Sequence, residues 1–496
     1  MIGMSLLAVL LGILIVLSAA TAARLALVIL LLLMVVLVWA MPDRKTSAMP
    51  IAWVLMAFAF TNLVWPRLVV FRASGFPALN PEKIAFFALL TVWFWVVMTS
   101  PKVREGLSYR LQSFRPVLWA LGILVAWRVI TAFAGLPAGY YWGVKVAVTE
   151  LFAYYLMLLI GLSVWHKPTD VRPFFWILVL AGLSVSLIAA YEASVSRNLF
   201  SSYISFDEDA TGRVVDNLSD KFRSGKYRVQ AGFEHPLVLA EFLVMAIPCA
   251  IYLTVSSRRL LVRGAMLGAV AVFCLVAYKT DSRAAQGMIV LTFFLAALLF
   301  AYRSFRVSKS ILGVVIGLLV PAILLTIPLL ISVVAGLIEG AGATVSGSTS
   351  ARLCMVQRGI PLAMEHPFFG FGIGQGGQEL GCVVIGGLHS VDNHYVSLAL
   401  DSGLPALLAY VFAMTWFGWR LFLLVRDPQT EDGALAICLL LTLIAFCGMQ
   451  AILSITSNTW LLFALMGAMG TLIARPGKPM NKAARGMSGT SSQMTR

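Results

Sequence analysis

The side chains best suited to accept a proton gather in one short segment, residues 389–395, which reads His-Ser-Val-Asp-Asn-His-Tyr. A carboxylate or an imidazole placed there can act as a general base for an attacking hydroxyl group. Asp392, His389 and His394 are therefore candidate catalytic residues, and Asn393 lies among them.

The same segment also fits a structural interpretation. Ser390 or Asp392 would then cap a short helix that ends at Gly403, and Pro405 would open the next apolar run. Both interpretations place Asp392 close to the mouth of an apolar segment. They differ in whether its carboxylate takes part in chemistry or only begins a helix.

Two arginines lie on residues 350–364, a stretch that begins like a helix. Arg352, Met355 and Gly359 recur at a spacing of three and four, so Arg352 shares a face with apolar residues, whereas Arg358 lies elsewhere. The planar fork of an arginine gives bidentate hydrogen bonds to a phosphate. Both are candidate phosphate ligands, and a solvated arginine is the alternative.

Several ionisable residues intrude into or border the apolar runs. Burying a charge in hydrocarbon is costly, so such residues usually pair with one another or line a polar cavity. The structural alternative to substrate binding is an ion pair, such as Arg128 with Glu150 or Glu241. The whole group consists of Arg128, Lys145, Glu150, Glu192, Glu241, Asp281 and Arg283.

Other motifs exclude several kinds of site. The glycine-rich stretch 365–374 follows no predicted strand, which argues against a dinucleotide site, and no Gly-rich loop precedes Lys-Ser/Thr. We therefore expect neither ATP hydrolysis nor a cytosolic nucleotide-sugar donor. No cysteine–histidine spacing is typical of a metal site. Cys354 and Cys382 share one loop, where an oxidising compartment would let them pair, although spacing alone does not establish the geometry.

The elements that carry these residues are apolar helices. The 496 residues are 60% apolar and 12% charged, with a mean hydropathy of +0.91, which excludes an ordinary soluble domain. The sequence predicts an all-α integral membrane protein with about 14 transmembrane helices, in the range 12 to 14. The predicted spans are 3–21, 25–41, 50–66, 83–100, 116–134, 146–164, 174–192, 236–255, 262–278, 286–302, 310–335, 404–425, 434–453 and 459–474.

The orientation follows from the basic residues of the loops. Alternate loops hold 21 lysines and arginines on one side, against seven in the short loops of the other side. The positive-inside rule then places both termini in the cytoplasm. The net charge of +15 reflects these loops and does not point to nucleic acid.

The predicted organisation is one polytopic membrane domain, 1–474, followed by a disordered cytoplasmic tail, 475–496. Two long loops face outward. The first, 193–235, has mixed charge, and a solvated mobile loop is as good an interpretation as a functional one. The second, 336–403, lies between the eleventh and twelfth spans and carries the candidate site residues.

Four segments together resemble the O-antigen ligase and polymerase superfamily, membrane proteins that join glycans carried on undecaprenyl diphosphate. No single motif is specific, but the order and the placement of the segments agree over residues 230–425. The segments are Gly232-Phe233-Glu234-His235-Pro236; Thr280-Asp281-Ser282-Arg283; Arg352 through His366-Pro367 to Gly374; and Asp392-Asn393-His394-Tyr395 with Gly403.

The resemblance implies transfer of a glycan from a lipid diphosphate donor to a sugar hydroxyl at the periplasmic face of the bacterial inner membrane, without a metal or cofactor. Arg283 and Arg352 would hold the diphosphate and stabilise it as it leaves. The segment near Asp392 would serve the acceptor. Besides these two arginines, the substrate-binding candidates are Arg358, Arg128, His235 and Asn393. A flippase and a chain-length regulator are the protein partners that such an enzyme would have.

One departure separates two activities within the family. Ligases of lipopolysaccharide carry His-Asn where this chain has Asp392-Asn393, eleven and ten residues before Gly403. A carboxylate can still accept the proton, so we rank Asp392 first among the candidate bases. The change favours a polysaccharide polymerase over a ligase that transfers glycan to lipid A-core. A transporter or flippase is the non-enzymatic alternative, but the sequence shows no internal repeat of the kind such folds use.

Overall fold

The computed structural model describes the chain with gaps. The described residues are 42–44, 46–67, 80–133, 140–200, 221–223, 225–307, 354–355, 357–382, 391–427 and 432–474, together with residues 36 and 69. Within them, nine helices are long and apolar enough to cross a membrane, and two shorter apolar helices accompany them. These eleven coincide with eleven of the fourteen predicted spans and confirm an all-α membrane protein. The other three predicted spans, at 3–21, 25–41 (apart from residue 36) and 310–335, and the tail 475–496 lie outside the described residues.

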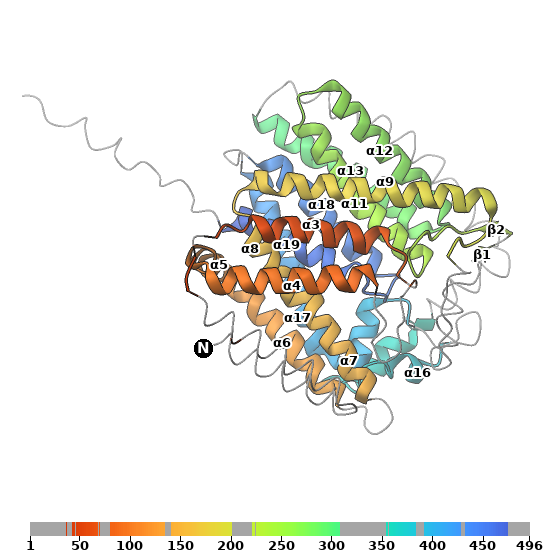
Figure 1. The fold of residues 1–496 in the computed structure, drawn as a ribbon. Coiled ribbons are helices and arrows are strands. Elements are labelled where there is room, and N and C mark those ends of the chain that lie inside the picture. Colours follow the sequence, from red (N-terminus) through yellow and green to blue (C-terminus); the bar gives the residue numbers. More distant parts are fainter. Residues whose placement is uncertain are drawn as a thin grey trace, which may run out of the picture.

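Figure 1 labels the helices and strands and colours them along the sequence. They are α3 (Met49–Val64), α4 (Pro81–Thr99), α5 (Pro101–Ser113), α6 (Arg115–Ala132), α7 (Tyr140–Leu151), the π-helical turn η1 (Phe152–Leu156), α8 (Met157–Val164), the 3-10 turn η2 (Pro168–Val171), α9 (Arg172–Val195), the hairpin strands β1 (Phe222–Arg223) and β2 (Lys226–Tyr227), α11 (Pro236–Ser256), α12 (Leu260–Lys279), α13 (Arg283–Val307), α16 (Gly376–Leu380), α17 (His394–Arg426), α18 (Gly433–Gln450) and α19 (Thr459–Ile473).

The centre of the bundle consists of α11, α18 and α19, which Figure 1 shows surrounded by the other helices. α11 and α18 are mostly buried against protein, whereas α4 buries little of its length. Small residues allow the closest helix crossing, since a Cβ atom at Gly467 of α19 would lie 2.5 Å from the Cα atom of Gly161 of α8. Such close approach of backbones is typical of membrane helix packing.

Contacts between connecting segments lie at two opposite ends of the bundle. At one end, Arg172 at the start of α9 donates to the carbonyl of Ser256 at the end of α11 at 2.6 Å. At the opposite end, Arg228 donates to the carbonyl of Thr280, between α12 and α13, at 2.9 Å. Figure 1 shows the β1–β2 hairpin at this second end and α5 at the first. The hairpin end is the one that the charge rule assigns to the outside.

The described part of the large loop, residues 354–382, has a small core of its own. Met355, Leu380 and Cys382 are buried there against Leu400 of α17. Cys354 and Cys382 form a disulfide with their Cα atoms 6.2 Å apart, a pairing that the sequence left open. This cross-link ties the helical segment 357–365 to the end of α16.

Helix α17 is interrupted near its start. Gly403 has φ 76° and ψ 178°, a conformation that only glycine adopts readily, and Pro405 follows in the next turn. The expected short helix that ends at Gly403 is therefore present, although it runs directly into the following span. The break separates nine residues at the membrane mouth from the longer spanning part.

Candidate functional site

The first residues of α17 show which polar side chain caps it. Asn393 is the N-cap, and its Oδ1 atom accepts from the backbone N–H of Val396 at 3.1 Å. The expectation of a cap at Ser390 or Asp392 is therefore wrong, because the helix begins at His394 and only the residue directly before it can reach the open N–H groups. The carboxylate of Asp392 is thus not used as the helix cap.

The candidate bases differ in their access to the outside. Asp392 is half-buried, and its backbone N–H donates to the sulfur of Met355 at 3.3 Å. His394 is buried, with its ring 5.1 Å from that of Tyr410. Of these two side chains, Asp392 is therefore the more accessible. His389 lies outside the described residues.

The glycine-rich turn packs directly on the break in α17. Phe371 donates its backbone N–H to the carbonyl of Leu400, and Leu404 donates to the carbonyl of Pro367, both at 2.7 Å. A Cβ atom at Gly403 would lie 2.3 Å from the carbonyl oxygen of Phe368, so no larger residue fits. The glycines and aromatic residues of this stretch therefore position the turn against α17.

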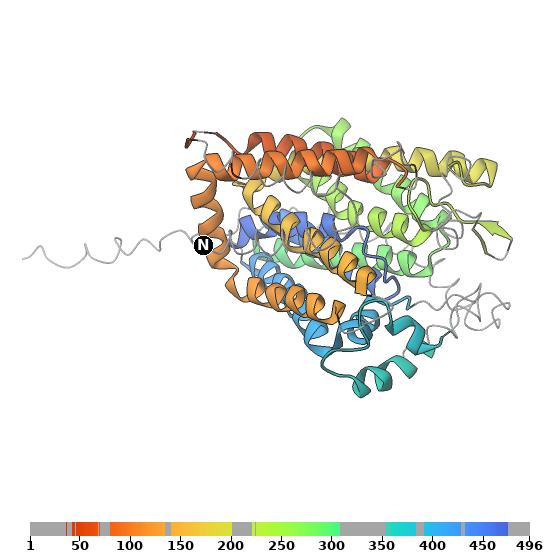
Figure 2. The same ribbon diagram turned by 60° about the horizontal axis from the view of Figure 1, so that its bottom comes forward.

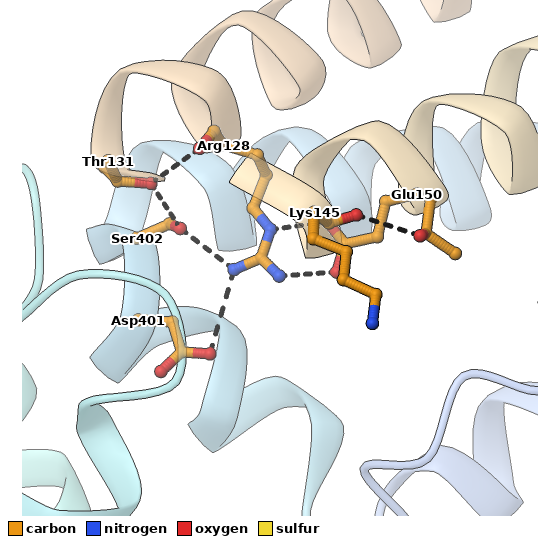
Figure 3. Close-up of polar contacts among 7 residues, drawn as sticks. Arg128, Thr131, Lys145, Glu150, Asp401 and Ser402 are labelled. Carbon is orange, nitrogen blue, oxygen red and sulfur yellow. Dashed lines mark hydrogen bonds and ion pairs between the residues drawn. The ribbon is translucent and has the colours of Figure 1, made fainter. Parts of the chain in front are cut away.

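Beneath the break lies a buried polar cluster, drawn in Figure 3. Arg128 of α6 donates from Nε to Glu150 of α7 at 2.6 Å, and a second guanidinium nitrogen contacts the other carboxylate oxygen. A further nitrogen donates to the hydroxyl of Ser402 at 3.0 Å and lies 3.8 Å from Asp401. Asp401 in turn accepts from the backbone N–H of Gly376 at 3.3 Å.

The sequence left two interpretations of Arg128 open, substrate binding and a structural ion pair, and these contacts distinguish them. Its donors are engaged by groups on α7 and α17, and its side chain is only 7% exposed. The ion pair with Glu150, one of the two carboxylates that the sequence left open, is present. Glu241 instead accepts from Gln450 at 2.8 Å and Asn458 at 2.9 Å. The geometry therefore supports a structural role for Arg128 over substrate binding.

A second group of polar residues lies at the hairpin end and is basic. His235 caps α11, its Nδ1 atom accepting from the backbone N–H of Leu237 at 3.1 Å. Burial, together with the positive charges of Arg228 and Lys221, lowers the pKa of His235 to about 3. His235 is therefore neutral near pH 7, and the two longer side chains carry the charge.

The same basic group extends to the connection between α12 and α13. Arg228 reaches the carbonyl of Thr280, three residues before Arg283, which begins α13. The hydroxyl of Ser282 accepts from the N–H of Ala285 at 3.2 Å and orders the first turn of that helix. Arg283 thus lies on a fixed helix start, on the connection that Arg228 contacts.

Part of the first long loop, residues 193–235, is anchored, contrary to the solvated interpretation. Glu192 of α9 is fully buried, and its carboxylate accepts from the backbone N–H groups of Gln230 and Ala231, at 3.1 and 2.6 Å. It also accepts from the hydroxyl of Tyr227 at 2.6 Å. The intramembrane charge of Glu192 therefore holds residues 227–231 in place. The residues between 201 and 220 lie outside the described part of the chain.

An apolar cavity of about 440 Å³ opens between α13, α17 and α18. Tyr395, the second residue of α17, lines one end of the cavity. Its hydroxyl donates to the carbonyl of Cys447 at 2.9 Å. Met288, five residues after Arg283, also lines it, which is about 7.5 Å along a helix axis. The cavity is therefore an apolar groove. The end that Tyr395 lines lies near the segment that contains Asp392 and near the start of α13 at Arg283. Its further lining comes from Leu291, Val411, Met414, Thr415, Gly418, Leu440, Leu443, Ile444, Cys447 and Gly448.

The remaining candidate residues are placed as follows. Arg358 is exposed on the helical segment 357–365, while Met355 and Gly359 are buried, as the predicted spacing requires. Arg352 lies outside the described residues. Sequence reasoning did not identify Arg228 as a member of the basic group near Arg283. Its position seven residues before His235, in a loop that contains a family-like segment, is the only signal that pointed to it.

A comparison with curated proteins finds no match. Residues 268–411, from the middle of α12 into α17, match the family model described as O-Antigen ligase. This segment contains Arg283, the glycine-rich turn, Asp392 and the break at Gly403. Over this segment, which is less than half of its length, the chain is similar to the O-antigen ligase family.

Proposed function

We propose that this membrane protein polymerises oligosaccharide repeat units carried on undecaprenyl diphosphate into exopolysaccharide or O-antigen, at the periplasmic face of the bacterial inner membrane. The observation that carries the proposal is the apolar groove beside Tyr395. A polyprenyl chain needs an apolar path within the membrane, and its diphosphate needs cations at the membrane surface. The groove supplies the path, and the basic group near Arg283 supplies the cations.

In this proposal, Arg283 binds the diphosphate, with Arg228 and Lys221 adding positive charge from the anchored loop. Charge-assisted hydrogen bonds to phosphate are stronger than neutral ones and would grow in strength as the diphosphate leaves. The acceptor hydroxyl would lie near Asp392, which takes its proton. The sugar oxygen then bonds to the anomeric carbon as the bond from that carbon to the diphosphate breaks.

The orientation in the proposal rests on two independent features. The hairpin end carries the smaller share of basic loop residues, which places it outside. The Cys354–Cys382 disulfide lies in the loop that packs at α17 near this end, and disulfides persist in oxidising compartments. Both termini are then cytoplasmic. The replacement of the ligase histidine by Asp392 favours the polymerase over the ligase.

The test is a reconstitution with purified protein in lipid bilayers that contain lipid A-core, to which a lipid-diphosphate-linked oligosaccharide of one repeat unit is added. The polymerase produces a ladder of longer glycans that remain lipid-linked. A single addition to lipid A-core instead would identify the ligase. Movement of unmodified lipid-linked substrate across the bilayer, with no new glycosidic bond, would identify a transporter and overturn the proposed chemistry.

A further inference from the structure

The helical segment 357–365 and the residues after it expose apolar side chains beside a membrane span. Ile360 is 58% exposed, Met364 60% and Phe368 66%. A soluble surface seldom carries such residues in a row. In both ribbon views this teal part of the chain lies at the periphery of the molecule, and in Figure 2 it lies at the opposite edge from α3 and α4.

The exposed apolar residues occupy one side of the helix. With the buried residues Gly359 and Ala363 facing the protein, the helical period puts Ile360 and Met364 on one flank, roughly 100° to 140° around the axis. Arg358 and Glu365, which are also exposed, fall on the other flank, roughly 240° to 260° around. The exposed surface is thus divided into an apolar flank and a charged flank.

The apolar flank continues the surface of a membrane helix. The ring of Phe369 stacks on that of Trp127 in α6, with centroids 5.2 Å apart and planes 4° apart. The indole N–H of Trp127 also donates to the carbonyl of Phe368 at 2.7 Å. Trp127 lies beside an exposed stripe along α6 that includes Ile123 and Ile130. Phe368 and Phe369 therefore lie directly next to the exposed surface of α6, which is a predicted span.

We propose that residues 357–369 form an interfacial membrane element that inserts Ile360, Met364 and Phe368 into the outer leaflet and keeps Arg358 and Glu365 in water. Amphipathic helices with this division of side chains lie in the plane of the bilayer surface. Aromatic residues such as Trp127 and Phe369 are typical of the boundary between hydrocarbon and water. The occupant of the apolar flank is lipid, because the flank is continuous with a helix that lipid already surrounds.

The inference does not depend on the enzymatic activity. It concerns how the large loop is held relative to the bilayer, and it can be tested on protein that makes no product. The disulfide between Cys354 and Cys382 and the packing of the turn on Gly403 fix this segment to the bundle. The depth of the segment in the membrane is therefore a property of the fold.

The experiment uses the full-length protein in nanodiscs of neutral phospholipid, with the disulfide intact and the four free thiols replaced by alanine; these are Cys249, Cys274, Cys438 and Cys447. A nitroxide spin label is attached in turn through Met364→Cys and the matched neighbour Glu365→Cys. Both sites are exposed, so the label does not disturb a core. Collisions with oxygen, which partitions into lipid, and with a water-soluble nickel chelate are then measured.

We expect the ratio of oxygen to nickel accessibility to be several-fold higher at position 364 than at position 365. Equal ratios at the two positions would overturn the proposal, since both flanks would then lie in the same environment, water or lipid. Protection of position 364 from both reagents would also overturn it, because a protein partner or a second copy would then cover the flank.

Discussion

Arg128 in α6 and Glu150 in α7 form a buried ion pair in which both guanidinium edges are used, one toward the carboxylate and one toward Ser402 of α17. The side chain of Arg128 thus connects α6, α7 and α17 directly beneath the break at Gly403. The pair is only 22 residues apart in sequence, but the third partner is 274 residues away from Arg128. The cluster therefore joins the first half of the chain to the segment that carries the family match.

Arg128→Ala should lower stability strongly, because Glu150 would remain as a buried charge without its partner. Removing one member of a buried pair costs about 3 to 5 kcal/mol. The double variant Arg128→Met, Glu150→Leu should recover part of this loss, since it removes the buried carboxylate of Glu150 and leaves only Asp401 without the guanidinium. The thermal midpoint of the purified protein in detergent measures both. An equal decrease of the thermal midpoint in the single and double variants would show that the unpaired charge of Glu150 does not cause the loss of stability.

Gly403→Ala should destabilise the loop and lower activity. Its backbone conformation costs a non-glycine residue about 1 to 3 kcal/mol, and the new Cβ would overlap the carbonyl of Phe368. The matched control is Gly264→Ala in α12, where nothing lies within 4 Å of the added Cβ. That change should be neutral or stabilising by up to about 1 kcal/mol. The thermal midpoint should therefore decrease in Gly403→Ala and should stay the same or increase in Gly264→Ala. Similar midpoints in the two variants would contradict the requirement for glycine at position 403.

The pH dependence of stability should contain a component from His235. Because the folded protein keeps His235 neutral down to pH of about 3 while the unfolded chain protonates it near the ordinary value of 6.5, the unfolded state binds more protons in this window. Stability should therefore fall as the pH decreases from about 6.5 towards 3. His235→Asn retains a capping side chain but cannot titrate. Its thermal midpoint should show a smaller decrease over the same pH range, and an unchanged slope would contradict the assignment.

Arg283→Ala should weaken binding of the lipid diphosphate about tenfold or more, which corresponds to the loss of a charged hydrogen bond of about 1.5 to 3 kcal/mol. Arg283→Lys should recover only part of the affinity, because lysine lacks the bidentate fork. Arg263→Ala, at the other end of α12, is the control and should bind as the wild type does. Titration of the donor into purified protein measures all three, and an unchanged affinity in Arg283→Ala would remove this residue from the site.

Sequence patterns predicted the helices well because hydrocarbon thickness imposes a length and an apolar composition on each span. The break at Gly403 was also predictable, since Gly403 and Pro405 together end a helix. Contacts between distant segments were not. Glu150 and Glu241 were equal partners for Arg128 on the sequence, and only the packing of α6 on α7 decided between them. The cap at Asn393 was missed by one residue, because adjacent polar residues cap equally well by type.

The central claim is that Asp392 accepts the proton of the acceptor hydroxyl at the mouth of the groove, and Asp392→Asn tests it most directly. Because Asn393 caps α17, the substitution leaves the helix start intact. The measurement is the ladder of lipid-linked products from the reconstituted variant, with donor binding recorded on the same sample. We predict retained binding and a rate lower by about 10² to 10⁴. A product ladder of wild-type length and yield would contradict the account.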